Sequence, residues 1–140
     1  MRHLLVLVSI WALLTPVYAT VDDAISRALE AIDPYVKQGY VVRDDQWGGD
    51  LGVKEQKAFP HTLFKGNDYW FCMGTDIDNA RIAIHVYDSK GKLVENSSWQ
   101  KGRFAAARVL APATGTYYII VEVSNSPQER TSWAMVYAYK

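Results

Sequence analysis

Two groups of oxygen-bearing side chains could bind a metal ion. One group is Asp76, Asp78 and Asn79, and the other lies in a polar segment with Asp44, Asp45 and Asp50. Calcium takes several oxygen ligands from carboxylates and carbonyls on flexible loops, and either group could supply some of them. Neither has the spacing of a self-sufficient calcium loop, and both residue types are also ordinary turn formers. Calcium is therefore a candidate ligand, mainly at the first group, and no cofactor is expected to be required.

The residues that could act as a nucleophile or a base are few. Beyond residue 19 the histidines are His61 and His85, and the single cysteine is Cys72. Nucleophilic catalysis needs a nucleophile, a base and an orienting group brought together, and no Gly-x-Ser-x-Gly motif is present. We expect His61 on an edge strand, His85 on the solvent face of its strand, and Cys72 buried within an apolar run. The sequence therefore predicts no catalytic residue.

Two tryptophans are the candidates for ligand contact. Trp47 stands in the Gly- and Asp-rich segment 44–50, and Trp99 stands among serines and a glutamine at 97–100. Both segments look too polar for core strands. An exposed tryptophan flanked by hydroxyls and amides can stack on a sugar ring or anchor a protein contact. The alternative is that the rings fold back over an end of the fold, which is favoured for Trp47 and evenly balanced for Trp99.

Length and charge limit the classes of function. The chain has 140 residues, 49% of them hydrophobic and 21% charged, which suits one globular domain. Fifteen Lys and Arg residues balance fifteen Asp and Glu residues. Nucleic acid and anionic membranes are therefore not expected partners, because both require an excess of cationic charge. The single cysteine excludes an intramolecular disulfide.

The first nineteen residues have the pattern of a secretory signal peptide. A short basic start, residues 1–3, precedes the apolar run Leu4–Leu14, and Val17-Tyr18-Ala19 fits the small-x-small cleavage pattern. The apolar run is about eleven residues long, whereas a membrane-spanning helix needs about twenty. We therefore predict cleavage after Ala19, a secreted or periplasmic protein, and no membrane span in the chain that remains.

The segment that follows should be one amphipathic helix, residues 20–38. Its apolar positions, among them Ile25, Leu29 and Ile32, recur at steps of three and four residues. Pro34 should end or interrupt it near Asp33. Without a partner helix, its apolar face is expected to pack across a sheet edge, and the alternative is a helix that binds a partner protein.

From residue 39 to residue 140 the pattern changes to alternation, which is typical of strands. About eight short strands with turns between them predict an all-β, antiparallel, jelly-roll-like β-sandwich. Strong strands are expected at 68–73, 81–87, 103–110, 116–123 and 132–139, weaker ones at 40–42, 54–59 and 61–64, and a return strand from Leu93. The polar stretch 44–50 is expected to be a loop. In the last two strong strands, Tyr117, Ile119, Val121 and Val123 share one face, as do Trp133, Met135, Tyr137 and Tyr139.

The segment from about Lys54 to Tyr139 resembles the bacterial pre-peptidase C-terminal domain, a β-sandwich found on exported enzymes. The resemblance rests on four elements in order: Leu63–Phe71, similar to L-x-x-G-x-x-Y-x-F; the acidic turn Thr75–Asp78; the strand Ile82–Asp88 with its turn at Gly91; and Ala111–Tyr118, similar to A-P-x-x-G-x-Y. The resemblance implies a β-sandwich accessory module, and some members of that family bind calcium. We expect this chain to be a free-standing example.

The expected function is non-catalytic binding by an exported monomer. The partner would be an envelope or extracellular glycan or a protein, contacted by Trp99, with Trp47 as the second candidate contact. The alternative is a structural or partner-binding component that uses the helix face of Ile25, Leu29 and Ile32. A small secreted hydrolase is the third alternative.

Overall fold

The computed structural model describes residues 21–140, so the predicted signal peptide and its cleavage site lie outside the described residues. One helix, α1 (Val21–Val36), precedes eight strands within this range. The strands are β1 (Val41–Leu51), β2 (Gln56–Leu63), β3 (Asp68–Gly74), β4 (Arg81–Tyr87), β5 (Ser97–Lys101), β6 (Phe104–Leu110), β7 (Gly115–Asn125) and β8 (Thr131–Tyr139). No helix in residues 21–140 is long and apolar enough to cross a membrane.

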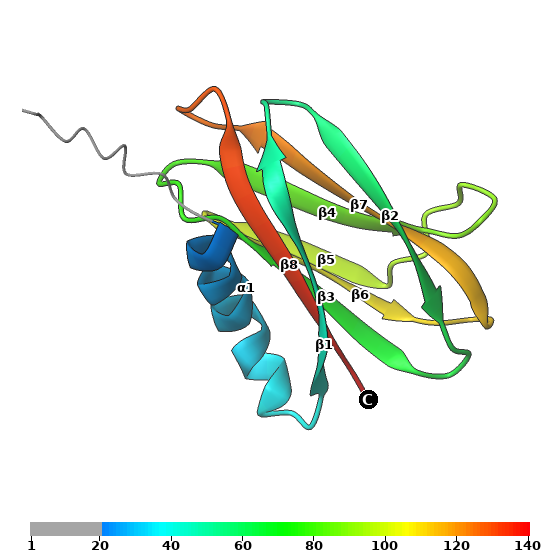
Figure 1. Ribbon diagram of the computed structural model, residues 1–140. Coiled ribbons are helices and arrows are strands. Elements are labelled where there is room, and N and C mark those ends of the chain that lie inside the picture. Colours follow the sequence, from blue (N-terminus) through cyan, green and yellow to red (C-terminus); the bar gives the residue numbers. More distant parts are fainter. Residues whose placement is uncertain (1–20) are drawn as a thin grey trace, which may run out of the picture.

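The strands form two facing antiparallel sheets, so the predicted sandwich with one N-terminal helix is confirmed (Figure 1). One sheet has five strands in the order β1-β8-β3-β6-β5, and the other has three in the order β2-β7-β4. Along β7 and β8 the side chains alternate as predicted, so the faces that begin at Tyr117 and at Trp133 point into the core between the two sheets. The main core lies between the sheets, and its largest fully buried side chains include Phe71, Met73, Ile119 and Trp133.

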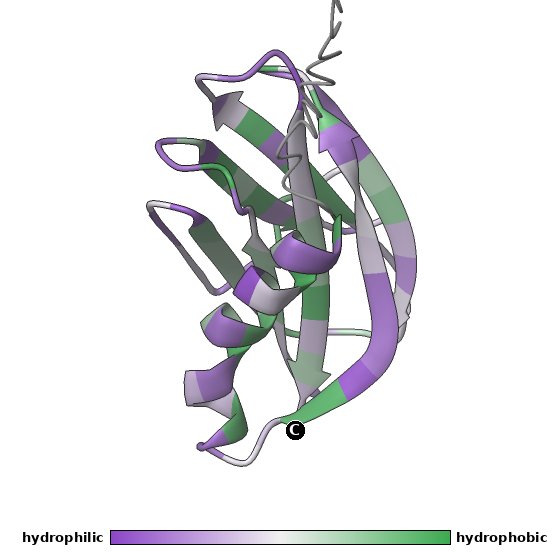
Figure 2. Cartoon of the chain, turned by 60° about the vertical axis from the view of Figure 1, so that its left-hand side comes forward, coloured by the Kyte–Doolittle hydropathy of each residue, from purple (hydrophilic) through white to green (hydrophobic). Residues whose placement is uncertain are grey.

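The helix packs on the outer face of the five-stranded sheet, mainly over β8 and β3, and not across a sheet edge as predicted (Figure 1). The physical reason is that β3 and β8 are apolar on both faces. Trp70 and Val136, for example, point away from the main core and form a second core with Ala28 and Ile32 of α1. Figure 2 shows hydrophilic and hydrophobic segments alternating along α1, as one buried face requires.

Pro34 lies inside α1, which continues to Val36 and does not end near Asp33. Proline removes one helical hydrogen bond and normally destabilises the last turn. Here the ring of Tyr35 stacks on Trp70, with centroids 3.9 Å apart and planes 13° apart. This stacking holds the final turn against the sheet.

The polar stretch 44–50, predicted as a loop, is the middle and end of β1. It pairs with β8 after a register shift between Val42 and Gln46. An edge strand pairs on one side only, so its polar side chains can face water while its backbone completes the ladder. β2 is also an edge strand, and it runs through Pro60. Proline, which has no backbone NH to donate, is tolerated there because one side of the strand is unpaired.

The predicted return strand at Leu93 forms only a single bridge, to Tyr87. The strand that follows is β5, which contains Trp99 and forms the outer edge of the five-stranded sheet. As an edge strand, β5 pairs with β6 alone, so this polar segment can form a strand while its side chains face water.

Candidate functional site

The helix covers only part of the sheet on which it packs. Its contacts are mainly with β8 and β3, so the outer face of β5 and part of β6 is left open beside it. The result is a groove of about 740 Å³, which we call the helix groove. Its lining residues are Glu30, Ala31, Pro34, Asp78, Asn79, Trp99, Lys101, Gly102, Arg103 and Phe104. The groove therefore joins the helix, the β3–β4 loop and the β5–β6 hairpin.

The floor of the helix groove is aromatic. Trp99 and Phe104 are half-buried and pack against the second core. The indole Nε1 of Trp99 donates a hydrogen bond of 2.8 Å to the Tyr35 hydroxyl. Burial raises the pKa of Tyr35, so this hydroxyl stays neutral and accepts the bond. Trp99 is thus fixed at its polar edge, and its exposed part lines the groove as an anchored apolar surface.

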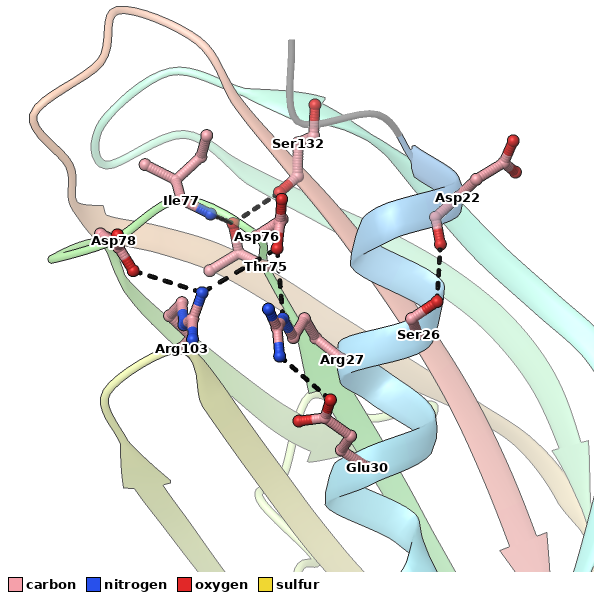
Figure 3. A network of polar contacts seen from close by, with 10 residues as sticks. All are labelled: Asp22, Ser26, Arg27, Glu30, Thr75, Asp76, Ile77, Asp78, Arg103 and Ser132. Carbon is pink, nitrogen blue, oxygen red and sulfur yellow. Dashed lines mark hydrogen bonds and ion pairs between the residues drawn. The ribbon is translucent and has the colours of Figure 1, made fainter. Parts of the chain in front are cut away.

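The rim of the groove is a network of ion pairs (Figure 3). Asp76 Oδ1 accepts a hydrogen bond of 3.2 Å from Arg27 Nε on α1 and lies 3.9 Å from Arg103 Nη1. Arg103 Nη1 also lies 3.2 Å from Asp78 Oδ1, and Arg27 pairs with Glu30 at 3.0 Å. Positive and negative side chains alternate along this rim, which attaches α1 to the β3–β4 loop.

A second set of contacts fixes the other end of α1. The Tyr35 ring that stacks on Trp70 also lies edge-on to Tyr40, at 6.1 Å. The Tyr40 hydroxyl donates a bond of 2.8 Å to Asp68, which in turn accepts two bonds from the guanidinium of Arg108. Both ends of the helix are therefore held, and the wall of the groove is positioned by the fold itself.

The predicted calcium residues lie at the rim, with their carboxylates already paired. The side chains of Asp76 and Asp78 are 30% and 84% exposed, and both carboxylates face Arg103. Asn79 has a positive φ of 62° in the same turn and lines the groove. Among residues 21–140, no group of three or more His, Cys, Asp or Glu side chains is arranged to hold a metal ion. Calcium binding at these three residues stays a prediction.

Trp47 lies away from the helix groove, near the open side of the sandwich between β1 and β2. Its half-buried ring packs on the main core and meets His61 edge-on at 5.3 Å. Burial lowers the pKa of His61 from its ordinary 6.5, and the charge of Asp45 only partly opposes this. The ring of Tyr137 lies 4.8 Å from that of His61. Trp47 therefore covers core side chains, which agrees with the interpretation that its ring folds back over the fold.

The remaining candidates for chemistry have structural partners. Glu95 lies 2.7 Å from Nδ1 of His85, and it accepts a bond of 2.8 Å from the Val86 backbone NH. Cys72 is fully buried under α1, and burial raises the pKa of its thiol well above the usual range. The surroundings of Cys72 confirm the predicted burial.

The structure brings Trp99, Asp78 and Asn79 into one groove and leaves Trp47 outside it. Sequence reasoning missed Phe104, Arg103 and the helix residues that form the wall. Phe104 and Arg103 lie only a few positions beyond Trp99, across the tight turn at Gly102. The helix wall had no signal of its own, since its small lining residue, Ala31, is not among the positions that define the predicted apolar face.

Together, the fold and the groove define a β-sandwich with a helix packed on one sheet and an open aromatic groove beside that helix. No protein-family model and no curated protein matches the sequence. The resemblance to the pre-peptidase C-terminal domain therefore stays a prediction from motifs. Among solved structures, the crystal structure of PliG from Aeromonas hydrophila, a periplasmic lysozyme inhibitor of g-type lysozyme, is similar. The identity is 15%, the TM-score is 0.52, and the match covers 74% of this chain and 90% of that chain.

Proposed function

We propose that this chain is an exported, non-catalytic module that binds a protein in the helix groove. The observation that carries the proposal is the groove itself. Its floor of Trp99 and Phe104 is apolar and fixed in place, and its rim carries the paired charges of Arg103 and Asp78. An apolar centre with an aromatic anchor and a polar rim is the usual arrangement of a protein-binding surface.

The similar solved structure supports the same class of function. PliG is described as a periplasmic inhibitor of g-type lysozyme, which makes it an exported protein that acts on an enzyme. The match covers most of both chains, so the two sandwiches share their general plan. A g-type lysozyme is therefore the first partner to test, and other cell-wall hydrolases are the next.

The test is direct binding by the purified chain 20–140. A g-type lysozyme and then a panel of secreted hydrolases would be measured by calorimetry and by inhibition of their activity. Replacing Trp99 or Phe104 with alanine should weaken binding by about tenfold or more, because anchors at the centre of an interface carry most of its energy. Phe64→Ala is the matched control, since Phe64 is 56% exposed and lies outside the groove.

Three results would overturn the proposal. The first is equal weakening by Phe64→Ala, and the second is unchanged binding by both groove variants. The third is hydrolysis of an ester, peptide or glycoside substrate that disappears when His61 or His85 is replaced. If Leu29→Ala weakens binding and Trp99→Ala does not, the partner contacts the exposed side of α1, where Leu29 is 42% exposed. That outcome would favour the helix alternative over the groove.

The calcium prediction is tested with the same protein. Calcium at Asp76, Asp78 and Asn79 would have to compete with Arg27 and Arg103 for the carboxylates. The proposed binding function needs no metal, so EDTA should leave the affinity and the melting temperature unchanged. A drop in affinity with EDTA that calcium restores, and that Asp78→Asn abolishes, would establish the metal site instead.

A further inference from the structure

The outer face of the three-stranded sheet is uncovered and apolar at its centre. In an antiparallel sheet with one solvated face, that face is normally polar. Cross-strand pairing instead aligns Pro60 with Tyr118 and Tyr118 with Tyr87, and a single bridge adds Leu93. Directly paired residues point to the same face of a sheet, so these four side chains form one row across the strands. We call this row and its surroundings the tyrosine face.

Exposure confirms that the row faces solvent in the described chain. Tyr118 is 38% exposed, Leu93 is 49% exposed, Pro60 is exposed and Tyr87 is half-buried. The helix packs on the other sheet, which leaves this face outside the sandwich (Figure 1). A contiguous exposed apolar patch is often functional on a folded domain, which makes this row a candidate binding surface.

Polar groups that can form hydrogen bonds flank the row on both sides. A parallel row holds Ala58, Ile120 and His85, and beyond it Gln56 Nε2 donates a bond of 2.8 Å to Glu122. On the other side Thr62 pairs with Thr116, and both are exposed. The tyrosine row itself carries no charged side chain, and the charged groups lie in the flanking rows, where Glu95 pairs with His85 at 2.7 Å and Glu122 accepts the bond from Gln56.

The size of the tyrosine face argues against a second copy as its occupant. Three strands about 4.8 Å apart and about eight residues long give a flat area on the order of 400 Å². A stable protein interface buries about 800 Å² on each partner. The face is therefore about half as large as a stable dimer needs, and it suits a narrow, elongated ligand.

We propose that the tyrosine face binds a neutral polysaccharide chain. Sugar rings have an apolar face that can lie on an aromatic ring and hydroxyls at their edges that need hydrogen-bond partners. Tyr118 and Tyr87 provide adjacent aromatic surfaces, and their hydroxyls, with Thr62, Thr116 and Gln56, provide the polar partners. The uncharged centre matches an uncharged chain and offers no counter-charge to an acidic or basic peptide. This site is separate from the helix groove and goes beyond the proposed protein binding.

The experiment measures retention of the chain 20–140 on insoluble chitin, cellulose and mannan, followed by titration with the matching soluble hexasaccharide. We expect wild type to bind one of these materials. Tyr118→Ala should weaken binding about tenfold, which is the scale of losing one stacked aromatic contact. Tyr118→Phe should retain most of the affinity, because it keeps the ring. Binding should change little between low and high salt, since no ion pair is involved.

Matched variants separate this proposal from the proposed function. Leu110→Ala removes an exposed apolar side chain from β6, in the other sheet, and should leave polysaccharide binding intact. Trp99→Ala should weaken protein binding in the groove and leave polysaccharide binding intact. The polysaccharide proposal is overturned if wild type is retained on none of the three materials, or if Tyr118→Ala is retained equally well. It is also overturned if Tyr118→Ala loses a protein partner or dissociates a dimer, because the occupant is then a protein.

Discussion

The charged residues of this chain that looked most like a metal site also hold the helix in place. Asp76 is shared by Arg27 of α1 and Arg103 of the β5–β6 hairpin, and Asp78 adds a second contact to Arg103. From the sequence, an acidic turn of this kind suggested calcium because it gathers carboxylate and amide oxygens on one loop. The two arginines that neutralise Asp76 lie 49 and 27 positions from it in the sequence, so no local pattern reveals them. Their arrangement also explains why the groove rim is close to neutral.

Asp68 pairs with Arg108 at 2.7 Å, which is shorter than the pairs of Asp76 with Arg27 and Arg103. The contribution of Asp68 to the stability of the fold should depend on pH. Burial raises the pKa of Asp68, but its bonds to Arg108 and Tyr40 lower it more, to below the ordinary 3.8. The folded chain thus binds this proton less tightly than the unfolded chain does. The stabilisation is complete above about pH 4 and disappears as the pH falls through the lowered value.

Asp68→Asn should therefore cost about 1–3 kcal/mol in the free energy of unfolding at neutral pH, because it leaves Arg108 without its partner carboxylate. The variant should also lose stability less steeply than wild type below pH 4, as measured by urea unfolding across a pH series. Asp33→Asn is the control. Asp33 pairs with Lys37 on the exposed side of the helix, and its loss should change stability by about 0.5 kcal/mol or less. A steeper acid dependence in Asp68→Asn would contradict this account.

At the scale of elements, α1 and β3 approach each other backbone to backbone. A Cβ added at Gly74 would lie 2.5 Å from the backbone nitrogen of Ala28 and 2.6 Å from the carbonyl carbon of Arg27. Both are helix backbone atoms, so the helix would have to move. At Gly48 the added Cβ would meet Val21 Cγ1, also at 2.5 Å, and the Trp133 carbonyl oxygen at 3.3 Å. Val21 is the first residue of α1, so its side chain can shift without displacing the rest of the helix.

These two glycines make a matched pair of variants. Gly74→Ala should destabilise the fold by about 1–3 kcal/mol or more, as overpacking against backbone does. It should also weaken partner binding in the helix groove, since α1 is one wall of it. Gly48→Ala should stay within about 1 kcal/mol of wild type. Thermal unfolding and the groove-binding measurement test both statements, and equal losses in the two variants would show that the helix is not held by backbone contact at Gly74.

The elements that could be predicted from the sequence are those with one clearly buried face. β3, β4, β6, β7 and β8 appear close to their expected bounds, because burial of alternate residues between the sheets imposes a period of two. The strands that were missed or shortened, β1 and β5, are edges of the five-stranded sheet. Their polar side chains face water, and only pairing with β8 or β6 makes them strands. Pairing is a long-range property, so the local pattern indicated a loop around Trp47 and no core strand around Trp99.

At the scale of the whole molecule, the position of the helix decides where the sites are. Trp99 and Asp78 were identified as binding candidates from their local surroundings, but their meeting in one groove depends on α1 covering β8 and β3 and leaving β5 open. Nothing in the sequence of α1 indicates which strands it covers. The same placement leaves the second sheet bare, so the tyrosine face depends equally on a long-range feature.

The two proposed sites lie on opposite layers of the sandwich. The helix groove is on the outer side of the five-stranded sheet, and the tyrosine face is on the outer side of the three-stranded sheet (Figure 1). Packed sheets are about 10 Å apart, so neither ligand blocks the other and no side chain serves both sites. If both sites are occupied, the chain connects a protein to a polysaccharide.

This arrangement predicts simultaneous and independent binding. Chain already retained on polysaccharide should capture the groove partner with the affinity measured in free solution, within about twofold, because sites without shared residues are additive. Tyr118→Ala should weaken retention of the chain on the solid material, and with it capture of the partner there, without changing the partner's affinity in solution. Trp99→Ala should leave the chain on the material but lower the amount of partner it captures, in line with its weaker binding in solution. The measurement is a pull-down of the purified partner on polysaccharide with each variant. Competition between the two ligands would contradict independence, since it would require one surface, or one coupled structural change, to serve both.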